Sequence, residues 1–153
     1  GVGTALAHRA LKKPGRVFVV TGDGEWQEGS GWESAMCAAH YKLENLTVIM
    51  DRNHFQSSDR GTENVMSLEP LHEKFEAFNW GVRRINGNSI EELVDATGVL
   101  PIEEGKPSII IADTTKGKGV SFLEGEHNHC GRFGRDKEPA LFSQALRELE
   151  RAQ

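Results

Sequence analysis

The sequence has few cysteines, no long apolar run and no excess of basic residues, and each of these shortages argues against one class of protein. Its 153 residues include 2 cysteines, too few for a disulfide framework. No apolar run approaches the roughly 20 residues of a membrane-spanning helix, so no membrane association is expected. The formal net charge is -5, which gives no reason to expect a nucleic-acid partner. These features predict a reduced, cytoplasmic globular protein.

The length is that of one domain, large enough to bury a good core. The chain begins without Met, inside a segment with helical periodicity over residues 2–12. We interpret residues 1–153 as a single domain that lacks an N-terminal segment of the native subunit.

Short apolar runs alternate with helix-length segments along the chain. The runs are rich in β-branched residues and stop at turn residues, which is typical of strands. They predict strands over 16–21, 46–51, 80–85 and 107–112, with the first, second and fourth buried. Helical periodicity predicts helices over 2–12, 29–42, 71–78, 89–99 and 138–151, and residues 54–64 and 116–135 are expected to be irregular. This alternation predicts an α/β fold, a parallel sheet flanked by helices.

Two polar residues, Asp23 and Asn53, each directly follow one of the first two predicted strands. In a strand–helix–strand unit the two strands end at the same edge of a parallel sheet, where ligands bind. A carboxylate and an amide oxygen at that edge could hold a hard cation such as Mg²⁺, which takes oxygen ligands and bridges phosphates. The alternative is that both are ordinary turn residues after strands.

The motifs around these residues resemble those of one enzyme family. Residues 22–29, Gly-Asp-Gly-Glu-Trp-Gln-Glu-Gly, resemble the Gly-Asp-Gly-x-x-x-Glu-Gly stretch of transketolases, and the Asn-containing run 51–53 follows at the family's spacing. Residues 32–35 keep the family's register, and residues 116–122 resemble its later glycine loop. From residue 1 to about 139, the chain is similar to the N-terminal half of a transketolase, which has the thiamin diphosphate-binding fold.

The resemblance implies that this domain anchors thiamine diphosphate through Mg²⁺, or through Ca²⁺ or Mn²⁺ in its place. The metal ligands would be the side chains of Asp23 and Asn53 and the backbone carbonyl of Phe55. The backbone N–H groups of Gly24 and Glu25, at the start of a helical segment, would bind the diphosphate.

One residue in this region departs from the family pattern. Arg52 stands where the family usually has Asp or Asn. We expect this change to leave the ligand positions intact and to alter the local charge.

The resemblance also implies two catalytic residues, Glu28 and a histidine of the later loop. Glu28 matches a glutamate at the family's subunit interface; alternatively it is a first-turn glutamate favoured by the helix dipole. The histidine, which would contact the diphosphate and the sugar, is His127 or His129, with His129 preferred because Gly131 follows closely. Zinc at these histidines is disfavoured, because no second ligand cluster is visible in the sequence.

Two lysines of the glycine loop, Lys116 and Lys118, could screen phosphate charge, although loop lysines are usually solvated.

The activity implied is transfer of a two-carbon ketol unit from a ketose phosphate to an aldose acceptor. The activating glutamate of the family lies in another domain, so the fragment alone is expected to be inactive. It would need a pyrimidine-binding domain, in the split form a C-terminal subunit, and the pair would form a homo-oligomer. Two alternatives remain: another thiamine diphosphate enzyme, such as a deoxyxylulose-phosphate synthase or a 2-oxo acid dehydrogenase component, or a non-catalytic remnant of the fold.

Overall fold

A four-stranded parallel sheet forms the centre of the computed structural model, which describes residues 1–56, 61–125 and 138–151. The strands are β1 (Val17–Gly22), β2 (Leu46–Arg52), β3 (Gly81–Asn86) and β4 (Ser108–Asp113). Their order across the sheet is β1-β2-β4-β3, and every neighbouring pair is parallel. The predicted α/β fold with a parallel sheet is therefore confirmed.

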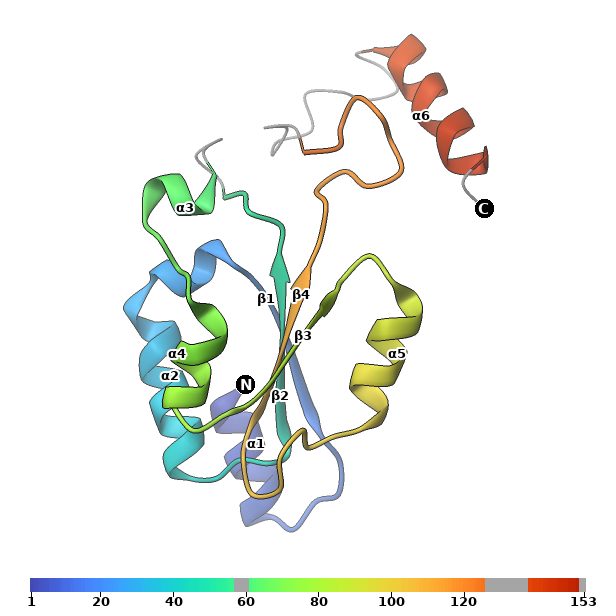
Figure 1. Cartoon of the computed structure of the whole chain (residues 1–153). Coiled ribbons are helices and arrows are strands. Elements are labelled where there is room, and N and C mark those ends of the chain that lie inside the picture. Colours follow the sequence, from blue (N-terminus) through green and yellow to red (C-terminus); the bar gives the residue numbers. More distant parts are fainter. Residues whose placement is uncertain (57–60, 126–137, 152–153) are drawn as a thin grey trace.

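Helices cover both faces of this sheet. One side carries α1 (Val2–Ala10), α2 (Gly29–His40) and α4 (Leu71–Ala77), and the other carries α5 (Ile90–Gly98) (Figure 1). Two short elements, η1 (Gly24–Gln27) and α3 (Thr62–Val65), follow β1 and β2, and α6 (Pro139–Arg151) lies beyond the carboxyl edge of the sheet. Within the described part of the chain, no helix is long and apolar enough to span a membrane.

The core lies on both sides of β4, because successive side chains of a strand point to opposite faces. Ile109 and Ile111 join the larger cluster beneath α2 and α4, whereas Ile110 joins the smaller cluster beneath α5. In the larger cluster, the buried Trp80 donates an indole hydrogen bond to the Ala35 carbonyl at 3.0 Å. The central strands are thus held from both faces, which fixes the edge where they end.

The strand β1 differs from its prediction. It is an edge strand, and its side chains Phe18 and Val20 are 50% and 72% exposed. The prediction of a fully buried first strand was wrong, because α5 packs on β3, at the opposite edge of the sheet. The prediction of a buried second strand is confirmed by β2, whose residues are buried at five of seven positions.

Candidate functional site

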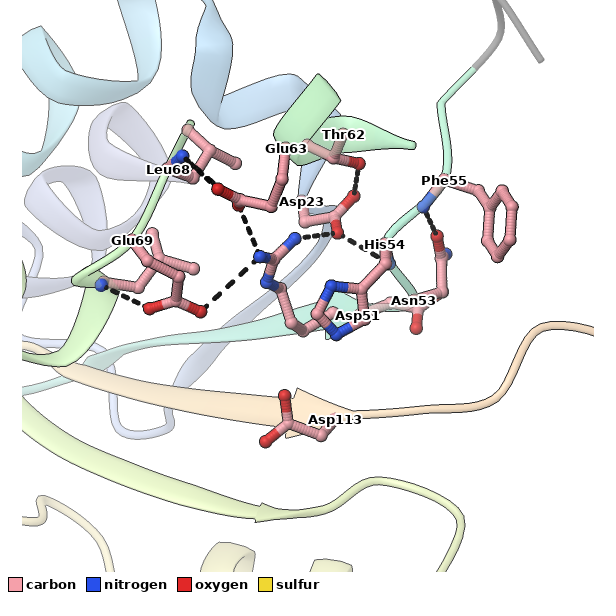
Figure 2. Close-up of polar contacts among 12 residues, drawn as sticks. Asp23, Asp51, Asn53, His54, Phe55, Thr62, Glu63, Leu68, Glu69 and Asp113 are labelled. Atoms are coloured by element: carbon pink, nitrogen blue, oxygen red, sulfur yellow. Dashed lines mark hydrogen bonds and ion pairs between the residues drawn. The ribbon is translucent and has the colours of Figure 1, made fainter. Parts of the chain in front are cut away.

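The two predicted ligands, Asp23 and Asn53, lie at the carboxyl ends of adjacent strands. β1 and β2 pair in register up to Gly22 and Asp51, and Asp23 directly follows β1 as Asn53 follows β2. The backbone N–H of Asp23 donates to the Asp51 carbonyl at 3.1 Å. The His54 backbone N–H donates to Asp23 Oδ2 at 2.8 Å (Figure 2). The fold therefore brings the two segments together at one sheet edge, as the sequence predicts.

Asp23 is fully buried and held by three donors. Its Oδ2 accepts from Arg52 Nη1 at 2.6 Å and from the His54 N–H, and its Oδ1 accepts from Thr62 Oγ1 at 3.0 Å. Arg52 is also fully buried, so the two side chains form a buried ion pair. From the sequence, Arg52 is expected only to alter the local charge, so this contact with Asp23 is a finding of the structure. An arginine at the end of a buried apolar strand was the available signal, because such a charge is rarely buried unpaired.

Asn53 is oriented by its neighbour Asp51. Asn53 Nδ2 donates to Asp51 Oδ2 at 2.7 Å, and Asn53 Oδ1 accepts from the Phe55 N–H at 2.8 Å. An ionised carboxylate only accepts hydrogen bonds, so the amide nitrogen must face Asp51 and the amide oxygen must face away. Asp51 is itself held by a hydrogen bond from Thr114 Oγ1. The first two residues of the run 51–53 thus each hold one of the two predicted metal ligands.

The loop after Asn53 folds back onto the start of η1. His54 has φ of 66°, in the left-handed region, and the next residue, Phe55, forms an isolated antiparallel bridge with Gly61. Gly24 has no side chain where the loop passes: a Cβ there would lie 2.9 Å from Gln56 Cβ. Close contact between the Gly-Asp-Gly turn and this loop therefore requires glycine at position 24.

Arg52 also belongs to a wider charge network. Its Nη2 contacts Glu63 and, at 3.5 Å, Glu69. Arg84 then joins Glu69 to Asp113, which lies at the carboxyl end of β4, with N–O distances of 3.1 and 2.7 Å. Opposite charges therefore link the ends of β1, β2 and β4 through the segment around α3.

Two carboxylates of this network, Glu63 and Glu69, have lowered pKa values. Burial acts to raise the pKa of Glu69, but the Leu71 N–H, the hydrogen bond and charge of Arg84, and the charge of Arg52 outweigh it. The same balance of burial against hydrogen bonds and the Arg52 charge lowers the pKa of Glu63. Both groups are consequently favoured as anions in the folded protein.

The remaining predicted site residues have less defined surroundings. Gly24 and Glu25 are the first two residues of η1, and Glu25 Oε1 accepts from the Gly22 N–H at 2.7 Å. Glu28 is exposed at the N-cap of α2 and makes no side-chain capping bond. The histidines His127 and His129 lie outside the described residues.

An open cleft of about 520 Å³ adjoins the Asn53 side of the site. Its lining includes Asp51 and Asn53 from the end of β2, and Thr114, Lys116 and Lys118 from the chain after β4. Lys118 lies 3.6 Å from Glu124, so its charge is partly balanced. Beside the Asp51 carboxylate, which accepts from Asn53 and Thr114, the cleft presents amide, hydroxyl and ammonium groups, which suit an anionic ligand.

The oxygen donors of this site suit a hard cation. Within residues 1–56, 61–125 and 138–151, no group of three or more His, Cys, Asp or Glu side chains could hold a metal ion. The predicted set of Asp23 carboxylate, Asn53 amide and Phe55 carbonyl instead contains only oxygen, which fits Mg²⁺ or Ca²⁺ and not a thiolate- or imidazole-bound zinc. The donor chemistry therefore fits the predicted metal.

A parallel α/β sheet with a glycine turn, an acid and an amide at its carboxyl edge is typical of a cofactor-binding domain. Comparison with known families narrows this class. The model of the family described as "Transketolase, thiamine diphosphate binding domain" matches residues 12–146. The chain belongs to this family.

Named relatives agree with this assignment. The chain is 42% identical over 142 residues to one subunit of the apulose-4-phosphate transketolase of Actinobacillus succinogenes, covering 92% of this chain and 51% of the relative. It is 42% identical over 125 residues to a 6-deoxy-6-sulfo-D-fructose transketolase subunit of a Clostridium species, covering 82% and 45%. The chain thus spans about half the length of these curated relatives.

A solved structure agrees in fold. Transketolase from Campylobacter jejuni superposes with a TM-score of 0.81 at 30% identity, covering 95% of this chain and 24% of that one.

Proposed function

We propose that this chain is the diphosphate-anchoring part of a transketolase that depends on thiamine diphosphate and Mg²⁺. The complete enzyme would transfer a two-carbon ketol unit from a ketose phosphate to an aldose acceptor. The family membership supports cofactor binding. The single observation that supports the anchoring role is the placement of Asp23 and Asn53 at the ends of adjacent parallel strands, joined by the His54–Asp23 hydrogen bond.

In this proposal the chain's residues bind and orient. Asp23 and Asn53 would each give one side-chain oxygen to Mg²⁺, and the Phe55 carbonyl would give a third. Gly24 and Glu25 would offer backbone N–H groups to the diphosphate. Thiamine diphosphate itself would supply the electron sink for making and breaking the carbon–carbon bond.

The remaining groups would take the roles that the resemblance to transketolases implies. Asn53 borders the cleft that Lys116 and Lys118 help to line, and these lysines would balance the diphosphate charge. Glu28, exposed at the N-cap of α2, would face a neighbouring protomer and link two active sites. His129, or alternatively His127, would contact the diphosphate and the sugar.

The proposal includes a partner that binds the aminopyrimidine ring. Both curated relatives described above are named as subunits of transketolases. By analogy, this chain would act with a C-terminal transketolase subunit, and the pair would form a homo-oligomer.

Binding of the cofactor tests the anchoring role. Calorimetry would measure thiamine diphosphate binding with Mg²⁺ and with EDTA, using the full-length subunit with its partner. Asp23→Asn is the informative variant. Arg52 and His54 both donate hydrogen bonds to the Oδ2 position, so the amide oxygen of the new Asn would take that position. Its amide nitrogen would then replace Oδ1. We expect it to weaken binding by more than about tenfold, because loss of a residue that merely orients a metal ligand already costs about 10- to 100-fold in metal affinity.

The matched control is Asp113→Asn, an acid at the end of a neighbouring strand of the same sheet that pairs with Arg84. It should bind the cofactor like the wild type. Cofactor binding that is independent of Mg²⁺, or equal in both variants, would contradict the anchoring role.

The reaction needs a separate assay. The complex would be given ketose phosphates with an aldose acceptor, or pyruvate as a 2-oxo acid donor. Ketol transfer supports a transketolase, whereas turnover of pyruvate alone supports another thiamine diphosphate enzyme. A complex that binds no cofactor would be a non-catalytic remnant of the fold.

A further inference from the structure

One side chain of α6, Glu148, holds the glycine loop of residues 116–122. Its Oε2 accepts a hydrogen bond from the Ser121 backbone N–H at 2.6 Å, and its Oε1 accepts one from the Ser121 hydroxyl at 2.9 Å. Gln144, one turn earlier in α6, donates to the same Oε1 at 2.7 Å. A single carboxylate of α6 therefore binds both the main chain and the side chain of one loop residue, and Figure 1 shows α6 beside the chain that follows β4.

The donors around Glu148 favour its ionised form. The hydrogen bonds from Gln144 and from the backbone and hydroxyl of Ser121 lower the pKa of Glu148. Hydrogen bonds to an ionised acceptor are roughly twice as strong as those between neutral groups. The contact between α6 and the loop is therefore of the kind that can fix a loop conformation.

The start of the loop is also held by a side chain from another element. The Thr115 N–H donates to Asn88 Oδ1 at 2.7 Å, and Asn88 lies between β3 and α5. Between Thr115 and Ser121, Gly117 and Gly119 have φ of 74° and 94°, in the left-handed region. Glycine loses more conformational freedom on ordering than any other residue. A segment with two glycines consequently depends on contacts at its ends to keep one conformation.

The segment between these two anchors carries the lysines of the cleft. Lys116 and Lys118 line the cleft, and so does Leu149, the residue after Glu148. A Cβ at Gly119 would lie 3.1 Å from Leu149 Cδ2, so α6 packs closely against this part of the loop. The helix that anchors the loop backbone is thus also a wall of the cleft.

We propose that Glu148 is a positioning residue, which anchors the glycine loop and thereby holds Lys116 and Lys118 in the conformation that binds the diphosphate of the cofactor. The inference rests on the proposed function, in which these lysines balance the diphosphate charge. It assigns a role in cofactor binding to α6, which lies beyond the carboxyl edge of the sheet.

Two simpler roles for Glu148 predict different results. If Glu148 acted only through its negative charge, its removal would strengthen the binding of an anion. If it only stabilised the fold, the effect of its removal would not depend on the lysines. Positioning predicts weaker binding, and it predicts that the loss disappears when the lysines are absent.

The experiment titrates thiamine diphosphate into the full-length subunit with its partner at saturating MgCl₂, with binding followed by calorimetry. Glu148→Ala should weaken binding by about tenfold, the scale of one hydrogen bond to a charged group. In the double variant K116M/K118M, which binds the cofactor more weakly, adding Glu148→Ala should cause no further loss.

The matched control is Glu150→Ala, which removes an exposed glutamate from the same helix and changes the charge equally. It should bind the cofactor like the wild type. Urea unfolding of each variant shows whether it is folded. If Glu148→Ala does not fold, Ser121→Ala replaces it, because this change removes only the hydroxyl bond to Glu148, and it should cause a smaller loss in the same direction.

Two results would overturn the inference: unchanged or tighter binding in Glu148→Ala, or an equal loss on adding Glu148→Ala to K116M/K118M. Absence of cofactor binding in the wild type would instead overturn the proposed function on which the inference rests.

Discussion

Arg52 and Asp23, 29 positions apart in the sequence, form an ion pair in which both side chains are fully buried. The pair joins the end of β2 to the turn after β1, at the edge where the candidate ligands lie. Because a buried charge depends on its partner, changes at Asp23 act on the fold as well as on any ligand.

We therefore expect Asp23→Ala to destabilise the protein strongly. It would leave Arg52 without the ion-pair partner that is itself fully buried, and loss of one member of a buried pair costs about 3–5 kcal/mol. Urea unfolding of the full-length subunit would measure the change in free energy of unfolding. Asp113→Ala is the control: its ion pair with Arg84 is partly exposed, which predicts a loss of about 1 kcal/mol or less. Equal losses in the two variants would argue against an energetically coupled buried pair.

The orientation of Asn53 gives a second prediction. Replacing Asp51 by Asn removes the requirement that the Asn53 amide nitrogen face this position, since an amide can donate as well as accept. Asn53 could then turn its oxygen away from the Phe55 side. Changes to residues that orient a ligand typically weaken metal binding by about 10- to 100-fold, so Mg²⁺-dependent binding of thiamine diphosphate should fall by about that factor in calorimetry.

The Thr114→Val variant separates orientation from charge. Thr114 donates to the other oxygen of Asp51, so this change perturbs Asp51 while leaving the Asn53–Asp51 bond and its charge in place. We expect a smaller effect than for Asp51→Asn. A larger effect would mean that Thr114, and not the orientation of Asn53, controls binding.

Glu69 gives a prediction for acid stability. Burial raises its pKa, but the Leu71 N–H and the two arginines outweigh burial, so the folded pKa lies below the ordinary 4.5. A lowered folded pKa contributes stability that is present above the unfolded pKa and is lost as the pH falls through the folded pKa. The wild type should therefore lose its advantage over Glu69→Gln progressively as the pH falls from about 5 through the lowered folded pKa.

Urea unfolding at a series of pH values would follow this convergence. Glu73→Gln removes an exposed carboxylate from α4, the helix that begins two residues after Glu69, and so measures the effect of lost charge alone. A constant difference between the wild type and Glu69→Gln across this range would contradict the assigned ionisation.

The order and type of the main elements could be predicted because their signals are local. The strands β2 and β4 are short apolar runs, and each ends one residue beyond its predicted end. The helix α3 was missed within the stretch predicted as irregular. Its four residues are too few for a periodic pattern, and it is held by contacts from distant segments, such as the Gln27 side chain bonded to the Thr62 carbonyl at 2.8 Å.

Part of the candidate site could also be predicted from local signals in the sequence. Asp23 and Asn53 follow strands, so parallel pairing places them at one edge. The Asp51–Asn53 bond could have been inferred, because residues two apart in extended backbone point to the same face, and Asn53 directly follows the strand that contains Asp51. The Arg52–Asp23 bond could not be inferred from spacing, since it depends on how the side chain of β2 reaches across to the turn after β1.

The close contact between Gly24 and the loop after Asn53 gives the last prediction. In Gly24→Ala, the new Cβ would lie 2.9 Å from Gln56 Cβ and 3.0 Å from its Oε1. The first of these atoms is next to the backbone, so the loop must move, and Phe55 and Asn53 would move with it. We expect Mg²⁺-dependent binding of thiamine diphosphate to weaken by about tenfold or more, since such ligands need accurate placement.

Gly29→Ala is the matched control for this variant. Gly29 begins α2, and a Cβ there would meet no atom within 4 Å. Alanine is also the better helix former, so folding stability should be equal or slightly higher. Cofactor binding should be unchanged in Gly29→Ala and weakened in Gly24→Ala, while thermal unfolding shows that both are folded. If Gly24→Ala binds the cofactor as tightly as the wild type does, the loop adjusts without moving the ligand oxygens. Glycine at position 24 would then not be required by the site.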